Sequence, residues 1–146
     1  MPNVERTITV AQPPEAVWRF IADFTTTEEW DPPTVSTERT SGDGGVGTTY
    51  HNVSKFSGRR TEVDYTVTEY VEGRCLQVRG AATGLELLDT ITVEPTPTGG
   101  SQVTYEARFT PSNGEAFDLP SMTSLGDFVA ESLQDSLEHL SGPRRP

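Results

Sequence analysis

The sequence predicts a single α+β domain in which a curved, seven-stranded antiparallel sheet wraps around one long C-terminal helix, with two short helices between the first two strands. Three observations predict this fold. Apolar residues alternate with polar ones over seven segments, helical periodicity appears after the first segment and again near the C-terminus, and the chain has only 146 residues. A chain of this length fits one domain, which we place at residues 1–141 with a disordered tail at 142–146.

The first strand is expected at residues 4–10, where apolar and polar side chains alternate. A first helix should follow from Pro13-Pro14-Glu15, because proline is tolerated in a first helical turn and an acid there favours the helix dipole. Its buried stripe is predicted at Val17, Phe20, Ile21 and Phe24, which recur at helical spacing.

A second short helix is expected to end at Trp30. Thr25 and Thr26 precede Glu28 and Glu29 by three residues, which is a doubled capping-box pattern, and the Asp31-Pro32-Pro33 run ends the helix.

Between residues 34 and 111 the hydrophobic period becomes two. We expect strands near 34–40, 46–56, 60–71, 73–80, 84–95 and 101–110, separated by segments rich in glycine, serine and proline. The alternation in 62–68 and 102–109 predicts one face on the core and one in water. The last element is a helix over about 119–140, roughly 33 Å long at ~1.5 Å per residue, which is enough to cross the sheet.

Composition excludes several classes of function. The net charge of −11, from 22 acidic and 11 basic residues, argues against nucleic-acid binding. No apolar run approaches the ~20 residues of a membrane span, and the N-terminus does not resemble a signal peptide, so we expect a cytoplasmic protein. The single cysteine, Cys75, excludes an intrachain disulfide, and no motif predicts a metal or a cofactor.

Four segments together resemble the START-like (SRPBCC) superfamily, near its polyketide cyclase/dehydrase and lipid-transport branch with the Bet v 1-like helix-grip fold. They are Val10 through Trp18 with its Pro14-Glu15-Ala16-Val17-Trp18 run, Phe20 through Pro32, Gly45-Val46-Gly47-Thr48 with Val67 through Leu76, and Gly99 through Tyr105. The chain departs from the family pattern at Glu72, where a proline is usual, and at Ser101, where threonine is usual. The resemblance implies the fold and leaves lipids, polyketides, other small ligands, protein partners or catalysis as possible functions.

A curved sheet and a straight helix leave a gap that either large side chains or a ligand must fill. The predicted ligand-binding residues are those on the inward side of strands and helices, and each has ordinary core packing as its alternative. They are Trp30, Tyr50, Asn52, Phe56, Tyr65, Val67, Leu76, Leu87, Asp89, Tyr105, Phe109, Met122, Leu125 and Val129.

Two polar residues of this set are more informative, because a buried polar group needs a partner. Asn52 and Asp89 could anchor the polar end of a ligand, and Asp89 is the one weak candidate for a catalytic base. The alternatives for Asp89 are a bulge that turns it outward, or a structural bond to Tyr65 or Tyr105. His51 is assigned to the solvent face, unless the register slips by one residue.

The leading hypothesis is a non-catalytic protein that binds or carries a small hydrophobic or aromatic ligand, as a monomer or homodimer. An aromatase/cyclase or dehydratase type of enzyme is the first alternative, and a protein-interaction module with a filled cavity is the second. By resemblance, Trp30 and the 41–47 loop are expected to gate the cavity mouth.

Overall fold

A computed structural model describes residues 3–31, 34–56, 59–82, 85–111 and 119–138, without the side chains of residues 3, 56, 59, 85, 111 and 119–128. The strands are β1 (Asn3–Val10), β2 (Thr34–Ser41), β3 (Thr49–Phe56), β4 (Arg59–Val71), β5 (Cys75–Ala82), β6 (Leu85–Pro95) and β7 (Ser101–Pro111). The helices are α1 (Pro14–Ala22), the 3-10 turn η1 (Phe24–Thr26), α2 (Thr27–Trp30) and α3 (Leu119–Glu138). The predicted α+β helix-grip architecture is confirmed.

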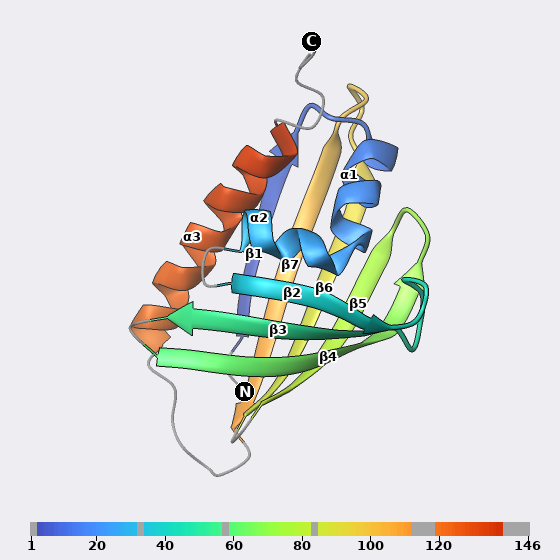
Figure 1. The fold of residues 1–146 in the computed structure, drawn as a ribbon. Coiled ribbons are helices and arrows are strands. Elements are labelled where there is room, and N and C mark those ends of the chain that lie inside the picture. Colours follow the sequence, from blue (N-terminus) through green and yellow to red (C-terminus); the bar gives the residue numbers. More distant parts are fainter. Residues whose placement is uncertain (1–2, 32–33, 57–58, 83–84, 112–118, 139–146) are drawn as a thin grey trace.

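The seven strands form one antiparallel sheet in the order β1-β7-β6-β5-β4-β3-β2. The first two strands of the chain therefore lie at opposite edges, and the segment α1–η1–α2 connects them across one face, which we call the inner face. Figure 1 shows that β2, β3 and β4 lie at a large angle to β1, β7 and β6. Helix α3 lies beside β1 and β7, on the same side of the sheet as the short helices. The sheet is strongly curved, as the sequence predicts.

Two hydrogen bonds of Gln12, just before α1, connect the C-terminal end of α3 with the start of β7. The Gln12 side-chain amide donates to the Glu138 carbonyl at 2.8 Å, and the Ser101 hydroxyl donates to the Gln12 carbonyl at 2.7 Å. Ser101 is fully buried. Its hydroxyl therefore provides an anchor at the position where the family pattern usually has threonine.

The predicted capping box is wrong. The cap of η1 is Asp23, whose carboxylate accepts from the Thr25 backbone N–H at 3.1 Å, while Thr26 makes no side-chain cap for α2. The Glu28 carboxylate instead accepts from the Thr37 backbone N–H at 2.8 Å, which ties α2 to β2. Sequence spacing alone could not tell whether Glu28 caps the helix or binds the backbone of β2. The strands predicted at 46–56 and 73–80 begin later, at Thr49 and Cys75.

The tail at 142–146 and the last predicted helical residue, Leu140, lie outside the described residues. No helix in the described part of the chain is both long and apolar enough to cross a membrane.

Candidate functional site

Asp89 lies in the middle of β6 and its side chain points to the inner face. It is 6% exposed, and its register neighbours are Val78 on β5 and Ala107 on β7. The pairing of β6 runs without a bulge past this position, so the alternative in which a bulge turns Asp89 outward is wrong. The Oδ1 atom of Asp89 is buried and has no hydrogen-bond partner among the described residues. A buried oxygen without a partner costs about 1–3 kcal/mol, so it calls for an explanation.

Two tyrosines lie beside this carboxyl group. Tyr105 on β7 is two residues from Ala107, which makes it a diagonal neighbour of Asp89, at a typical separation of about 7–8 Å. Tyr65 on β4 reaches toward it across β5. Burial raises the pKa of both phenols well above the usual value, and the charges of Asp89 and Asp31 raise them further.

Gly80 on β5 explains how Tyr65 reaches this place. A Cβ at Gly80 would come within 2.7 Å of Cε1 of Tyr65 and 2.8 Å of Cγ1 of Val63. The missing side chain therefore leaves the space that the tyrosine ring occupies across the middle of the sheet. Any larger residue at this position would push the ring away from β6.

Asp31, just after α2, brings a second carboxyl group to the same interior. The Thr34 hydroxyl donates to its Oδ2 at 2.6 Å. Burial raises the pKa of Asp31 from 3.8 to about 6, against the lowering effect of that hydrogen bond. Burial raises the pKa of Asp89 from 3.8 to about 8, and the charge of Asp31 adds to the rise. At neutral pH Asp31 is therefore mostly ionised and Asp89 mostly protonated.

This group of side chains, Asp31, Tyr65, Asp89 and Tyr105, is called the inner polar cluster below. Trp30 adds an aromatic wall, since its ring meets that of Tyr105 edge-on with centroids 5.9 Å apart. A protonated carboxyl group can donate a hydrogen bond, an ionised one can accept, and a carboxyl group with a pKa near neutrality can also exchange a proton with a ligand. The cluster can thus hold a polar group or serve acid–base chemistry.

The inner face has two parts that differ in packing. The closed end is packed solid by side chains that are no more than 1% exposed: Val17, Ile21, Ile91, Val93, Val103, Leu133 and Leu137. The open end surrounds the inner polar cluster, and there Leu87, Tyr105 and Phe109 face inward yet keep accessible surface. Inward-facing side chains that are not sealed by their neighbours are what a ligand-binding hollow requires.

Asn52 does point inward, but its side chain is engaged by other residues. Its amide nitrogen donates to the hydroxyls of Thr37 at 2.9 Å and Thr34 at 3.2 Å, and its carbonyl accepts from the Ser54 hydroxyl at 2.6 Å. Thr37 in turn shares a 2.7 Å hydrogen bond with Thr27. These bonds join β2 and β3 to α2, so the structure gives Asn52 a structural role instead of the predicted role as a ligand anchor.

The remaining predicted lining residues divide into three groups. Val67 and Leu76 are 1% exposed, and Val129 and Trp30 are 2% exposed, so all four are closely packed. Leu87 and Phe109 belong to the open end. The side chains of Phe56, Met122 and Leu125 lie outside the described residues.

His51 points away from the inner face, as predicted. Its ring nitrogens lie 2.8 Å from Asp64 and 3.1 Å from Glu62 on the neighbouring strand β4. The hydrogen bond with Asp64 is the main cause that raises the pKa of His51. No grouping of three or more histidine, cysteine or acidic side chains suited to a metal ion occurs in the described part of the chain.

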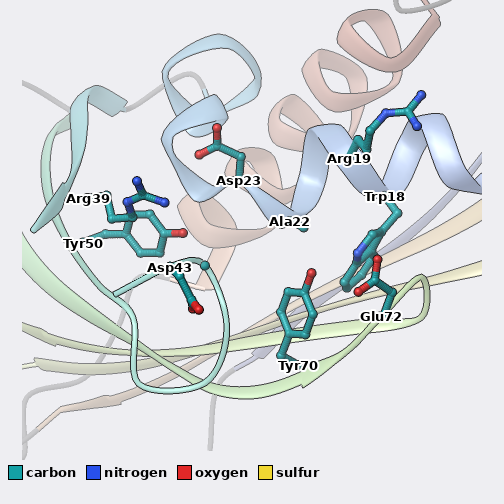
Figure 2. A pocket seen from close by; sticks show the side chains of 10 residues that line it. Trp18, Arg19, Ala22, Asp23, Arg39, Asp43, Tyr50, Tyr70 and Glu72 are labelled. Carbon is teal, nitrogen blue, oxygen red and sulfur yellow. The ribbon is translucent and has the colours of Figure 1, made fainter. Parts of the chain in front are cut away.

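A pocket of about 290 Å³ lies between α1 and the 42–48 loop, apart from the inner polar cluster (Figure 2). Figure 2 shows the hydroxyl groups of Tyr50 and Tyr70 directed into it. Its walls are Trp18, Arg19, Ala22, Asp23, Arg39, Asp43, Gly44, Tyr50, Tyr70 and Glu72. Only Tyr50 is among the predicted site residues. Burial is the largest cause that raises the pKa of Tyr50, while Asp23 raises it further and Arg39 lowers it.

The expected gate, formed by Trp30 and the 41–47 loop, stays a prediction. Asp43 and Gly44 of the 42–48 loop line the pocket shown in Figure 2, whereas Trp30 is buried near Tyr105 and does not line that pocket. The loop is held by several hydrogen bonds, including Gly44 N–H to the Thr48 hydroxyl at 2.8 Å and Gly47 N–H to the Val67 carbonyl at 2.9 Å. Trp30 and the loop therefore belong to different parts of the molecule.

Solved structures confirm the fold. A START superfamily protein from Mycobacterium smegmatis has a TM-score of 0.79 at 13% identity, covering 95% of this chain and 99% of that chain. The protein TTHA0849 from Thermus thermophilus has a TM-score of 0.77 at 14% identity, with 97% and 100% covered. The Zhui aromatase/cyclase from Streptomyces sp. R1128 has a TM-score of 0.73 at 16% identity, with 94% of each chain covered.

No curated protein matches the sequence. The family model described as polyketide cyclase/dehydrase and lipid transport, in contrast, matches residues 1–141, which is nearly the whole chain. With the helix-grip sheet, the long C-terminal helix and the START-type structural relatives, this match shows that the chain belongs to the polyketide cyclase/dehydrase and lipid-transport family of the START-like superfamily.

Proposed function

We propose that this protein binds a small hydrophobic or aromatic ligand in the interior between the sheet and α3, and that the ligand's polar end meets the inner polar cluster. The observation that carries the proposal is the buried Oδ1 of Asp89, which lacks a hydrogen-bond partner among the described residues. A ligand group that hydrogen-bonds to this oxygen would remove the cost of leaving it unpaired. The partly exposed inward side chains of Leu87, Tyr105 and Phe109 would contact the ligand's apolar body.

The family description supports this proposal, because it joins lipid transport with polyketide chemistry. A protein-interaction module with a filled interior fits less well. In a filled core, an unpaired carboxyl oxygen would be a permanent cost with no function to offset it.

One observation favours catalysis as a second candidate. The pKa of Asp89 is raised to about 8, close to neutral pH, where an acid–base catalyst is most effective. Tyr65 and Tyr105 stand close enough to feel its charge, so they are candidates for holding a substrate oxygen. The aromatase/cyclase among the structural relatives is consistent with this alternative.

Binding is tested with N-phenyl-1-naphthylamine, an uncharged dye that fluoresces in apolar surroundings. We expect saturable binding at one site per chain. Asp89→Asn should change the affinity severalfold, while Glu86→Gln, on the exposed face of the same strand, should leave it unchanged. Dye binding that is absent, or equal in all three proteins, would contradict the proposed site.

Native mass spectrometry of protein purified from its own host adds the identity of the ligand. A retained compound recovered unchanged after prolonged incubation supports a carrier. Conversion of that compound in solution, lost in Asp89→Asn, would support the enzyme.

A further inference from the structure

We propose that the polar end of the ligand is a cation, such as a protonated amine or amidine attached to an aromatic or apolar body. This inference rests on the proposed function and adds the charge of the ligand. Two carboxyl groups face the interior, the buried Asp89 and the half-buried Asp31, and neither makes an ion pair with a basic side chain in the described part of the chain. A buried acid without a counter-charge is the complement of a buried cation.

Among the described side chains, the groups that face Asp89 from the neighbouring elements are acidic, phenolic or apolar. Asp31 comes from the end of α2, Tyr65 from β4 and Tyr105 from β7, and these are the groups whose charges couple to it. From β5 it is faced by Val78, and the described side chains of α3 that are buried on the sheet are Val129, Leu133 and Leu137.

The described basic side chains are not among the charges that shift the pKa values of the inner polar cluster. No arginine, lysine or histidine is among the buried residues of the described chain. Arg6, on the edge strand β1, is opposite Tyr105, but its Nη1 donates to the Glu5 carbonyl at 2.8 Å, and its charge is not among those that shift the pKa of Asp89 or Tyr105. His51 and its acidic partners are on the outer face. A carboxylate ligand would therefore meet negative charge here, with no compensating positive charge from the described side chains.

Aromatic rings surround the same place, and ring faces attract cations. Tyr105 is the diagonal neighbour of Asp89, and Trp30 packs edge-on against Tyr105. The ring of Tyr65 lies over Gly80 on the strand next to β6, and the charges of both carboxyl groups raise its pKa. An amidinium has two parallel N–H groups that suit a carboxylate, so it can satisfy the buried Oδ1 of Asp89. The cluster therefore offers a cation both a charge partner and an aromatic enclosure.

The inference is tested with three probes that share one aromatic body and differ in charge: 2-naphthamidinium, 2-naphthylmethanol and 2-naphthoate. Isothermal titration calorimetry at pH 7 should give the affinity order amidinium, alcohol, carboxylate, with at least tenfold between the first and the last. The cation should bind the ionised form of Asp89 more tightly than the protonated form. Because the pKa of Asp89 is about 8, the ionised fraction rises about tenfold from pH 7 to pH 9, and the affinity for the amidinium should rise by the same factor. The alcohol should change less than twofold.

Two variants locate the effect. Asp89→Asn should abolish the rise with pH and reduce amidinium affinity at pH 9 by tenfold or more, while Glu86→Gln should behave as the unaltered protein. Circular dichroism at each pH verifies that both variants are folded.

The outcomes separate the two proposals. If none of the probes binds, both the interior site and the cation inference fail. If the alcohol or the carboxylate binds as tightly as the amidinium, the interior site stands and the cation inference is overturned. An amidinium affinity that rises with pH equally in Asp89→Asn would also overturn it.

Discussion

The two ends of the inner face are built on the same strands, yet different kinds of side chain fill them. At the closed end, Val93 and Val103 on neighbouring strands are completely buried under Ile21 and Leu137. At the open end, a few residues further along the same strands, Asp89 and Tyr105 occupy equivalent inward positions. One end of this sheet is therefore filled by apolar side chains, while the other carries a buried carboxyl group and a phenol at the same inward positions.

The largest expected effect is the loss of packing at the closed end. Leu137→Ala removes most of a side chain that is fully buried, so it should lower the free energy of unfolding by about 2–5 kcal/mol. Leu87→Ala at the open end makes the same chemical change in a partly exposed side chain and should cost less than half as much. Urea denaturation of both variants measures the difference. Equal losses would mean that the open end is packed as tightly as the closed end.

The next effect is the pH dependence of stability caused by Asp89. Folding raises its pKa from 3.8 to about 8, so between these values the folded state holds a proton that the unfolded state releases. The contribution of Asp89 to the free energy of unfolding should therefore be greatest below pH 4. It should fall as the pH rises toward 8, by up to about 1.4 kcal/mol per pH unit.

Asp89→Asn isolates this contribution, because it keeps the shape and removes the ionisation. From pH 6 to pH 8 the unaltered protein should lose about 2–3 kcal/mol more than the variant. The raised pKa of Asp31 also makes the free energy of unfolding depend on pH, but mainly below pH 6, because that pKa is only about 6. Parallel stability curves for the two proteins would show that Asp89 is ionised or solvated in the folded state.

Much of this contrast could be foreseen in the sequence and part of it could not. Strict alternation along β6 places Asp89 on the inner face with Ile91, and the structure confirms both its direction and its burial. Alternation also places Asn52 inward, but says nothing about partners. Its bonds to Thr34 and Thr37 depend on the pairing of β2 with β3.

Sequence reasoning misses Asp31 as a member of the interior, because it follows a helix and precedes two prolines, where an exposed turn is the ordinary interpretation. Only the path of α2 across the inner face brings it near Asp89. The role of Gly80 is hidden for a similar reason. A glycine in a strand can indicate a close approach, but the sequence does not say which ring approaches it.

Gly80→Ala fills space on β5 beside the open end. The added methyl group would collide with Tyr65 and Val63, so we expect a loss of about 1–2 kcal/mol, since overpacking outweighs the usual gain from replacing glycine. Gly45→Ala is the control, because it meets only a side-chain oxygen of Asp43 at 3.5 Å and should change stability by less than about 0.5 kcal/mol. Thermal or urea unfolding gives both values. A stabilised Gly80→Ala would show that the Tyr65 ring moves aside without cost.

The smallest effect concerns α2, which carries Asp31 into the open end. Glu28→Ala removes the acceptor for the Thr37 N–H and should cost about 1 kcal/mol, whereas Glu29→Ala, next to it on the same exposed turn, should cost less than about 0.5 kcal/mol. If both glutamates were helix caps, as their spacing after Thr25 and Thr26 suggests, the two losses would be similar. Urea denaturation distinguishes these cases. A larger loss for Glu28, together with a changed affinity for the amidinium probe in that variant alone, would show that the tie between α2 and β2 also positions Asp31.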